Sequence, residues 1–127
     1  MVHNAAATRL LAATVAATAL LPTSYGHAST KFDGAWSVVV LTTSGRCDPS
    51  YRFSGQVVNG EISYIYGSLE VSGNVVASGA TFVRVTGGSG HAEAHGHFTV
   101  THGSGTWRGE GANGLCAGTW SATRVRS

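Results

Sequence analysis

Three copies of a Gly-x-Trp motif occur in this chain of 127 residues: Gly34-Ala35-Trp36, Gly105-Thr106-Trp107 and Gly118-Thr119-Trp120. Each places a large amphipathic indole close to a position without a side chain, at the edge of a short segment of alternating apolar residues. Small β-barrels and β-sandwiches start and close their sheets with such segments. The motif therefore constrains the architecture strongly and the chemistry weakly.

Alternating apolar segments and glycine-rich turns follow one another along the chain, which favours strands over helices. The strongest turn signal is Asn59-Gly60, which readily adopts the positive φ angles of a two-residue hairpin. A second turn is expected at Ser72-Gly73-Asn74. Strands are expected over residues 35–43, 51–57, 61–66, 69–71, 75–77, 80–86, 92–101, 105–109 and 117–125. The pattern predicts an all-β antiparallel meander of about eight strands, either a small up-and-down barrel or a β-sandwich.

Residues 1–28 have the organisation of a secretory signal peptide. Arg9 precedes an apolar core over 10–21, and small residues stand before a cleavage point after Ala28. A core of about 12 residues is too short to cross a bilayer. We therefore expect residues 29–127 to form one β-barrel domain that is periplasmic or secreted, without stable membrane insertion after cleavage.

The chain has two cysteines, Cys47 and Cys116. In an exported chain such a pair predicts a disulfide. Cys47 follows the first expected strand and Cys116 precedes the last. These two ends are neighbours when the first and last strands pair, as the closure of a barrel requires.

Several functions are disfavoured by composition and by missing motifs. The net charge is only +2 with neutral histidines, and no basic stripe emerges, so nucleic acid is not an expected partner. The chain has no nucleophile elbow, no zinc-binding His-Glu-x-x-His helix and no phosphate-binding loop. We therefore expect a protein that is not an enzyme and needs no cofactor.

Four polar residues could form a metal or haem site: His91, Glu93, His95 and His97. They project from one face of a strand at intervals of about 6 to 7 Å. Neighbouring imidazoles can bind Zn²⁺ or Cu²⁺ or supply a haem ligand. In the alternative interpretation, the apolar residues between them face inward. The histidines are then ordinary polar residues of a wet outer face that gains charge below about pH 6.5.

Aromatic residues could line the mouth of a barrel and bind a ligand there. The candidate ligand-binding residues are Trp36, Tyr51, Tyr64, Trp107 and Trp120. Phe53 and Tyr66 lie on the same expected faces as Tyr51 and Tyr64. Alternatively, these residues simply fill the core of a domain that has few aliphatic side chains.

Several longer motifs resemble those of an uncharacterised family of short exported Gram-negative bacterial proteins with one disulfide. The motifs are Phe32-Asp33-Gly34-x-Trp36-Ser37, Ser44-Gly45-x-Cys47-Asp48, Tyr51-Arg52, Asn59-Gly60, Gly105-Thr106-Trp107-Arg108-Gly109 and Cys116-x-Gly118-Thr119-Trp120. The chain also resembles calycin-like barrels (lipocalins, avidins and periplasmic inhibitors), which open with Gly-x-Trp and pair the first strand with the last. Neither resemblance implies specific site residues.

Two functions follow as hypotheses. The first, which is preferred, is an exported, non-catalytic barrel that captures a small ligand or haem, which requires a cavity near the tryptophans and the tyrosines. The second is a module that binds an extracytoplasmic protein, as a protease or lysozyme inhibitor or an adhesin does. It would use its loops and a flexible segment at Ser29–Phe32. This second hypothesis predicts a filled barrel with an exposed apolar or aromatic patch.

Overall fold

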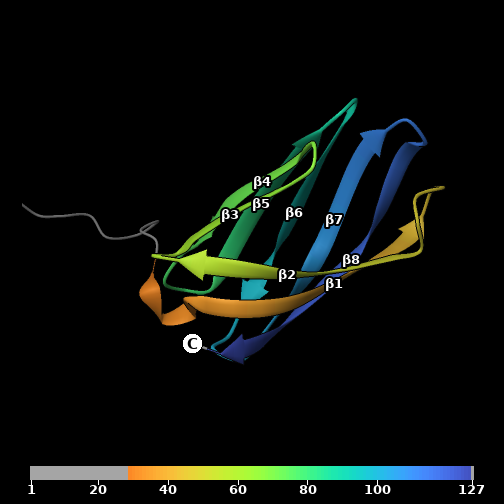
Figure 1. Ribbon diagram of the computed structural model, residues 1–127. Helices are drawn as coiled ribbons and strands as arrows, with labels where there is room; N and C mark the ends of the chain where they lie inside the picture. The colour runs from red at the N-terminus through yellow and green to blue at the C-terminus, as the bar shows by residue number, and fades with distance from the viewer. Residues whose placement is uncertain (1–28, 127) are drawn as a thin grey trace, which may run out of the picture.

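Eight antiparallel strands form a closed barrel in the computed structural model, which describes residues 29–126 (Figure 1). Each strand pairs with the next in sequence, and β1 also pairs with β8. The strands are β1 Gly34–Ser44, β2 Ser50–Val58, β3 Glu61–Tyr66, β4 Leu69–Val75, β5 Ala80–Gly87, β6 Gly90–Phe98, β7 His102–Gly111 and β8 Gly114–Arg126. The predicted all-β meander is confirmed, and the pairing of β1 with β8 makes it a barrel.

The predicted turn at Ser72-Gly73-Asn74 is wrong, because β4 runs without a break through these residues. Gly73 instead allows β4 and β5 to lie close together. A Cβ at this position would overlap the carbonyl oxygen of Phe82 and lie 2.9 Å from the Cα of Val83 on β5. A glycine in the middle of a strand can mark such an approach as well as a turn.

The two ends of the barrel differ. One end carries the β2–β3, β4–β5 and β6–β7 hairpins, and we call it the closed end. A 3-10 turn, η1 (Thr30–Phe32), lies there beside the start of β1 (Figure 1). Phe32 is buried against Phe98, with their ring centroids 6.2 Å apart. The prediction that Ser29–Phe32 is a flexible contact segment is therefore wrong, because its largest side chain belongs to the core.

Arg124 of β8 donates three hydrogen bonds to backbone carbonyls at and near the N-terminal turn, whose Phe32 plugs the closed end. Its Nε donates to Val100, Nη1 to Asp33 at 2.6 Å and Nη2 to Lys31 at 2.8 Å. The guanidinium also lies 4.9 Å from the ring centroid of Trp36, where a cation–π attraction operates. One side chain thus ties the N-terminal turn to the last strand.

Asp33 ties the same turn to the β2–β3 hairpin. Its carboxylate accepts hydrogen bonds from the backbone N–H groups of Asn59, at 2.7 Å, and Gly60, at 2.9 Å. Both N–H groups belong to the tight turn that the sequence predicts, where Asn59 has a φ of 53° and Gly60 a φ of 76°. The two carboxylate oxygens therefore satisfy two adjacent donors.

We expect Asp33→Asn to lower the free energy of unfolding by about 1 to 2 kcal/mol, because an amide offers only one acceptor oxygen and no charge. The measurement is urea unfolding followed by far-UV circular dichroism. Asp48→Asn is the matched control, since it makes the same charge change and the described hydrogen bond of Asp48 uses its backbone carbonyl. Equal losses in both variants would contradict a specific role for Asp33.

Two of the Gly-x-Trp motifs interlock inside the barrel. Gly105 of β7 faces Trp120 of β8, and Trp107 of β7 faces Gly118 of β8. Each indole crosses the glycine of the other motif and donates to a carbonyl on the strand beyond. Trp120 Nε1 bonds to His95 at 3.1 Å, and Trp107 Nε1 bonds to Leu41 at 3.0 Å.

The third motif follows a related plan at the closed end. Trp36 faces Gly55 across β1 and β2, is 2% exposed, and donates from Nε1 to the carbonyl of Phe32 at 2.9 Å. Its ring also meets Phe98 edge to face, with centroids 4.8 Å apart. Together with Val57, Val75, Trp120 and Ala122, these rings form the buried core.

The opposite end, which we call the open end, carries the β3–β4, β5–β6 and β7–β8 hairpins and the longer β1–β2 loop. The Cys47–Cys116 disulfide joins that loop to β8, as predicted, with the Cα atoms 6.2 Å apart. Gly45 allows the loop to fold back, because its φ is +94° and a Cβ there would lie 2.8 Å from the Sγ of Cys116. The disulfide is compatible with an oxidising, extracytoplasmic location.

The predicted signal peptide, residues 1–28, lies outside the described residues. Within residues 29–126, no helix is long and apolar enough to span a bilayer.

Candidate functional site

The seam between β2 and β3 is the weakest junction in the barrel wall. Only Val57–Ile62 and Val58–Glu61 pair across it, next to the hairpin turn, whereas β3 and β4 pair at six positions. Figure 1 shows β2 and β3 leaving their shared hairpin in diverging directions. We call the unpaired part, between Ser50–Gln56 of β2 and Ser63–Tyr66 of β3, the β2–β3 seam.

Four aromatic side chains lie along the inner side of this seam: Tyr51 and Phe53 on β2, and Tyr64 and Tyr66 on β3. We call them the aromatic row. Phe53 and Tyr64 stack across the seam with centroids 5.8 Å apart, and Tyr64 stacks on Tyr66 at 6.4 Å with an interplanar angle of 12°. Tyr51 is 44% exposed and Tyr66 68% exposed. The row thus runs from the half-buried interior to the solvent at the open end.

Local sequence explains this placement. Residues of one parity face inward on each strand, so Tyr51 and Phe53 share a face of β2, as predicted, and Val57 lies on the same face. The β3 residues Tyr64 and Tyr66 likewise share the inner face. Across β4, Tyr66 faces Leu69, which is 43% exposed and extends the apolar surface.

The five aromatic residues predicted to bind a ligand do not lie together. Trp36 and Trp120 are buried in the core, at 2% and 8% exposure. Trp107 is half-buried over Gly118. Tyr51 and Tyr64 belong to the aromatic row at the seam. Trp36 and Trp120 therefore fill the core, whereas Trp107 and the two tyrosines are partly exposed to solvent.

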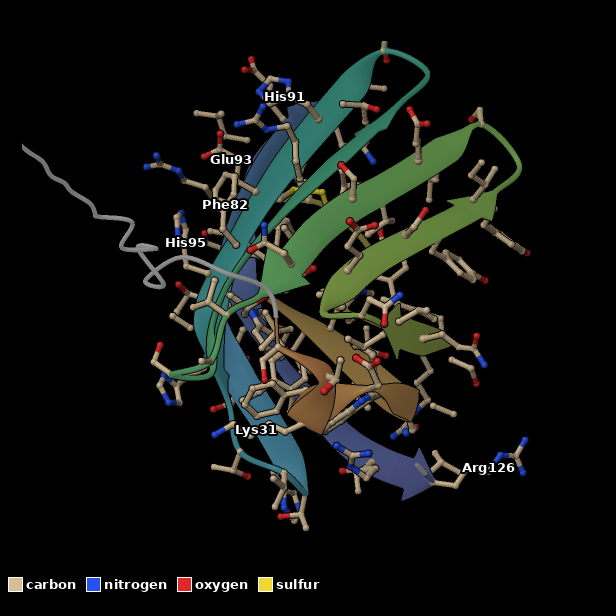
Figure 2. All side chains as sticks on the ribbon, turned by 90° about the vertical axis from the view of Figure 1, so that its left-hand side faces the viewer. Lys31, Phe82, His91, Glu93, His95 and Arg126 are labelled. Atoms are coloured by element: carbon tan, nitrogen blue, oxygen red, sulfur yellow. A yellow bond between two sulfur atoms is a disulfide. The ribbon has the colours of Figure 1, made fainter. Side chains whose placement is uncertain are left out.

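The histidine strand, β6, points its polar residues outward. Figure 2 shows His91, Glu93 and His95 in a row on the outer side of the barrel, with Phe82 of β5 beside them. His95 packs on Phe82 with centroids 4.7 Å apart. His97 lies near the closed end, where a Cβ on Gly79 would come within 2.9 Å of its Nε2. The structure agrees with the interpretation of a wet outer face.

Glu93 lies between two arginines across the strands: Arg84 of β5 and Arg108 of β7 are its register neighbours. Arg108 reaches it at 3.9 Å, although the Arg108 side chain is 80% exposed. Positive charges on both sides oppose a bound cation. Within residues 29–126, no three His, Cys, Asp or Glu side chains are grouped so that they could hold a metal ion. A metal or haem site on this face stays a prediction without geometric support.

Shallow hollows lie on the outer surface of the described part of the chain. One, of about 230 Å³, is lined by residues of β2, the hairpin turn and β3, among them Gln56, Asn59 and Ser63. Another, of about 310 Å³, lies against β6 and β7 and is lined by Glu93, His95, Thr106, Trp107 and Arg108, so it includes one of the predicted ligand-binding tryptophans. Neither is an enclosed cavity near Trp36 or Trp120.

The sequence alone does not predict the seam, although it predicts that Tyr51 and Phe53 share one face of their strand and that Tyr64 and Tyr66 share one face of theirs. The available signal was the composition of the two strands. On β2, Tyr51 and Phe53 alternate with the polar residues Arg52, Ser54 and Gln56. This alternation indicates that the polar residues form an outer face, but it does not show which strands lie beside β2. The divergence of β2 and β3 depends on the curvature of the whole barrel wall, so no local sequence pattern predicts it.

Fold and site together define a class: a disulfide-linked, eight-stranded antiparallel β-barrel, plugged at one end and open along an aromatic seam at the other. Comparison of the chain with protein-family models, with curated proteins and with solved structures finds no match. The resemblance to small exported proteins and to calycin-like barrels stays a prediction from the motifs.

Proposed function

We propose that this protein is an exported, non-catalytic binding module that contacts a protein partner through the aromatic row and the apolar residues around it. The observation that carries the proposal is the exposure of large apolar side chains at the open end. Tyr66 is 68% exposed and Ile65, on the other face of the same strand, is 71% exposed. Tyrosine is enriched among the residues that dominate binding energy at protein interfaces.

The filling of the barrel supports a partner that binds from outside. Trp36, Trp120 and Phe98 occupy the closed half, and the interlocked Gly105–Trp120 and Trp107–Gly118 pairs bring neighbouring strands into close contact. A filled interior with an exposed aromatic patch is the arrangement expected of the protein-facing hypothesis. A small ligand could still stack on Tyr64 and Tyr66, which are nearly parallel.

We expect Tyr66→Ala to weaken binding of the partner at least tenfold, about 1.4 kcal/mol, while the fold stays intact because the side chain is mostly exposed. A photoreactive benzoylphenylalanine at position 66 would first crosslink the partner in its native compartment. The affinity of the purified pair is then measured by calorimetry. Val100→Ala is the control, since Val100 is 53% exposed between β6 and β7, at the closed end of the barrel.

Two results would contradict the proposal. One is equal affinity of the wild-type protein and Tyr66→Ala for the crosslinked partner. The other is a stoichiometric small molecule or haem on the protein purified under non-reducing conditions, seen by native mass spectrometry and lost in Tyr66→Ala. That second result would establish the capture of a small ligand instead.

A further inference from the structure

We propose that the partner enters the β2–β3 seam as an extended peptide segment and adds a strand to the edge of β2. This inference rests on the proposed function and specifies its mode of recognition. Strand addition uses main-chain hydrogen bonds for affinity and alternate side chains for specificity. Both components are present along β2.

The direction of the backbone groups follows from the ladder between β1 and β2. In an antiparallel pair, a residue directs both its N–H and its C=O to one neighbour, and the next residue directs them to the other. Thr42 N of β1 donates to the carbonyl of Pro49, just before β2, at 2.9 Å. Because the direction alternates along the strand, the odd-numbered residues of β2 bond to β1. The backbone groups of Ser50, Arg52, Ser54 and Gln56 therefore face the seam.

Those four residues have no strand partner on the seam side within residues 29–126, because pairing with β3 starts only at Val57. Their side chains are exposed as well. Natural proteins usually protect such an edge with charged side chains, proline, a bulge or a covering loop. Between Ser50 and Gln56 the chain has no proline, its register with β1 is regular, and Arg52 is its one charged residue. The edge is available for pairing.

The aromatic row forms the inner floor beneath this edge. The stacked rings of Phe53 and Tyr64 bridge the seam on the barrel side, 5.8 Å apart. A strand lying in the plane of the wall would place every second side chain on this floor, near Tyr51 and Tyr66. The peptide should therefore carry apolar residues at alternate positions.

Charge specifies the outer face of the added strand. Arg52 is exposed on the outer side of β2, opposite Val39 of β1, and the ion pair found within residues 29–126 involves Arg108 and Glu93 instead. We therefore expect Asp or Glu in the added strand at the position beside Arg52, because opposite charges on neighbouring strands attract. The inferred ligand is an extended segment with alternating apolar residues and an acidic residue between them.

The test uses a peptide selected against the exported, disulfide-bonded protein from a phage-displayed library of random linear 12-residue peptides. The selected peptide is synthesised, and its backbone amides are N-methylated one at a time. Methylation of an amide that faces β2 removes a hydrogen-bond donor and introduces a clash. We expect at least tenfold weaker binding at every second position of the paired stretch and little change at the positions between.

Amide hydrogen exchange of the protein, measured residue by residue by NMR, gives an independent readout. With the peptide bound, the amides of Arg52, Ser54 and Gln56 should exchange at least tenfold more slowly. Those of Phe53 and Gly55 already bond to β1 and should change little. A scrambled peptide is the control and should protect none of them.

Several outcomes would overturn strand addition. They are a library that yields no binding peptide, binding that shows no two-residue period on N-methylation, and a dimer of this chain that itself protects the β2 edge. If Tyr66→Ala weakens binding of the natural partner but N-methylation of the peptide has no periodic effect, only the strand addition fails. If Tyr66→Ala leaves partner binding unchanged, the proposed function itself fails.

Discussion

Gly118→Ala is expected to destabilise the barrel by about 3 kcal/mol or more, because the added methyl group has no free space. A Cβ at position 118 would overlap the carbonyl oxygen of Leu41 and lie 2.8 Å from Trp107 Nε1. The obstacle on β1 is backbone, so β1 and β8 would have to separate where they close the barrel. The free energy of unfolding is measured by urea denaturation with circular dichroism.

Gly55→Ala is the matched control for this prediction. Gly55 also faces a tryptophan across two strands, but the nearest heavy atom to a Cβ there is Phe53 Cε2, at 3.9 Å. Its stability should be unchanged or slightly higher, since alanine loses less backbone entropy on folding than glycine. Should Gly118→Ala fold too poorly to be measured, Trp107→Phe tests the same interlock.

Trp107→Phe removes the indole N–H that donates to the Leu41 carbonyl and should lower the free energy of unfolding by about 1 kcal/mol. Wild-type stability in both Gly118→Ala and Trp107→Phe would contradict the interlock of the two motifs.

Removing the disulfide is expected to lower the free energy of unfolding by about 4 kcal/mol, because the bond closes a loop with a sequence separation of 69 residues. Small domains are stable by only about 5 to 15 kcal/mol, so this is a large share of the total. The variant is Cys47→Ser with Cys116→Ala. Alanine is used at position 116 because that site is 3% exposed and a serine hydroxyl would be buried there.

Denaturant unfolding of this double variant is compared with that of the wild-type protein in a reducing agent. Both should show the same loss, and the slope of unfolding against denaturant should rise as the unfolded chain expands. A loss below about 1 kcal/mol in both samples would contradict this prediction. It would show that positions 47 and 116 already lie close together in the unfolded chain without the disulfide.

Both structural predictions concern the same wall of the barrel. The glycine–tryptophan interlock draws β6, β7, β8 and β1 together, and the disulfide secures the loop that leads into β2. On the other side, β2 and β3 share only two residue pairs. The barrel is therefore tightly joined along one wall and weakly paired along the other.

Local features of the sequence determined the strands, most of their bounds and the hairpin turn at Asn59-Gly60. They also determined which side chains share a face, including the histidines on β6. Strand alternation has a period of two residues, and a tight turn needs positive φ angles, so a few neighbouring residues suffice for each of these features. The disulfide followed from cysteine number and the inferred compartment.

Only the tertiary structure decided the closure of the barrel, the plugging of its end by Phe32 and the placement of each tryptophan over a glycine of another strand. It also showed that Gly73 marks a close approach and that β2 and β3 diverge. These features depend on which backbones come within a few ångströms of one another, and the partners are distant in sequence. The β2–β3 seam, which carries the proposed function, arises from this long-range packing.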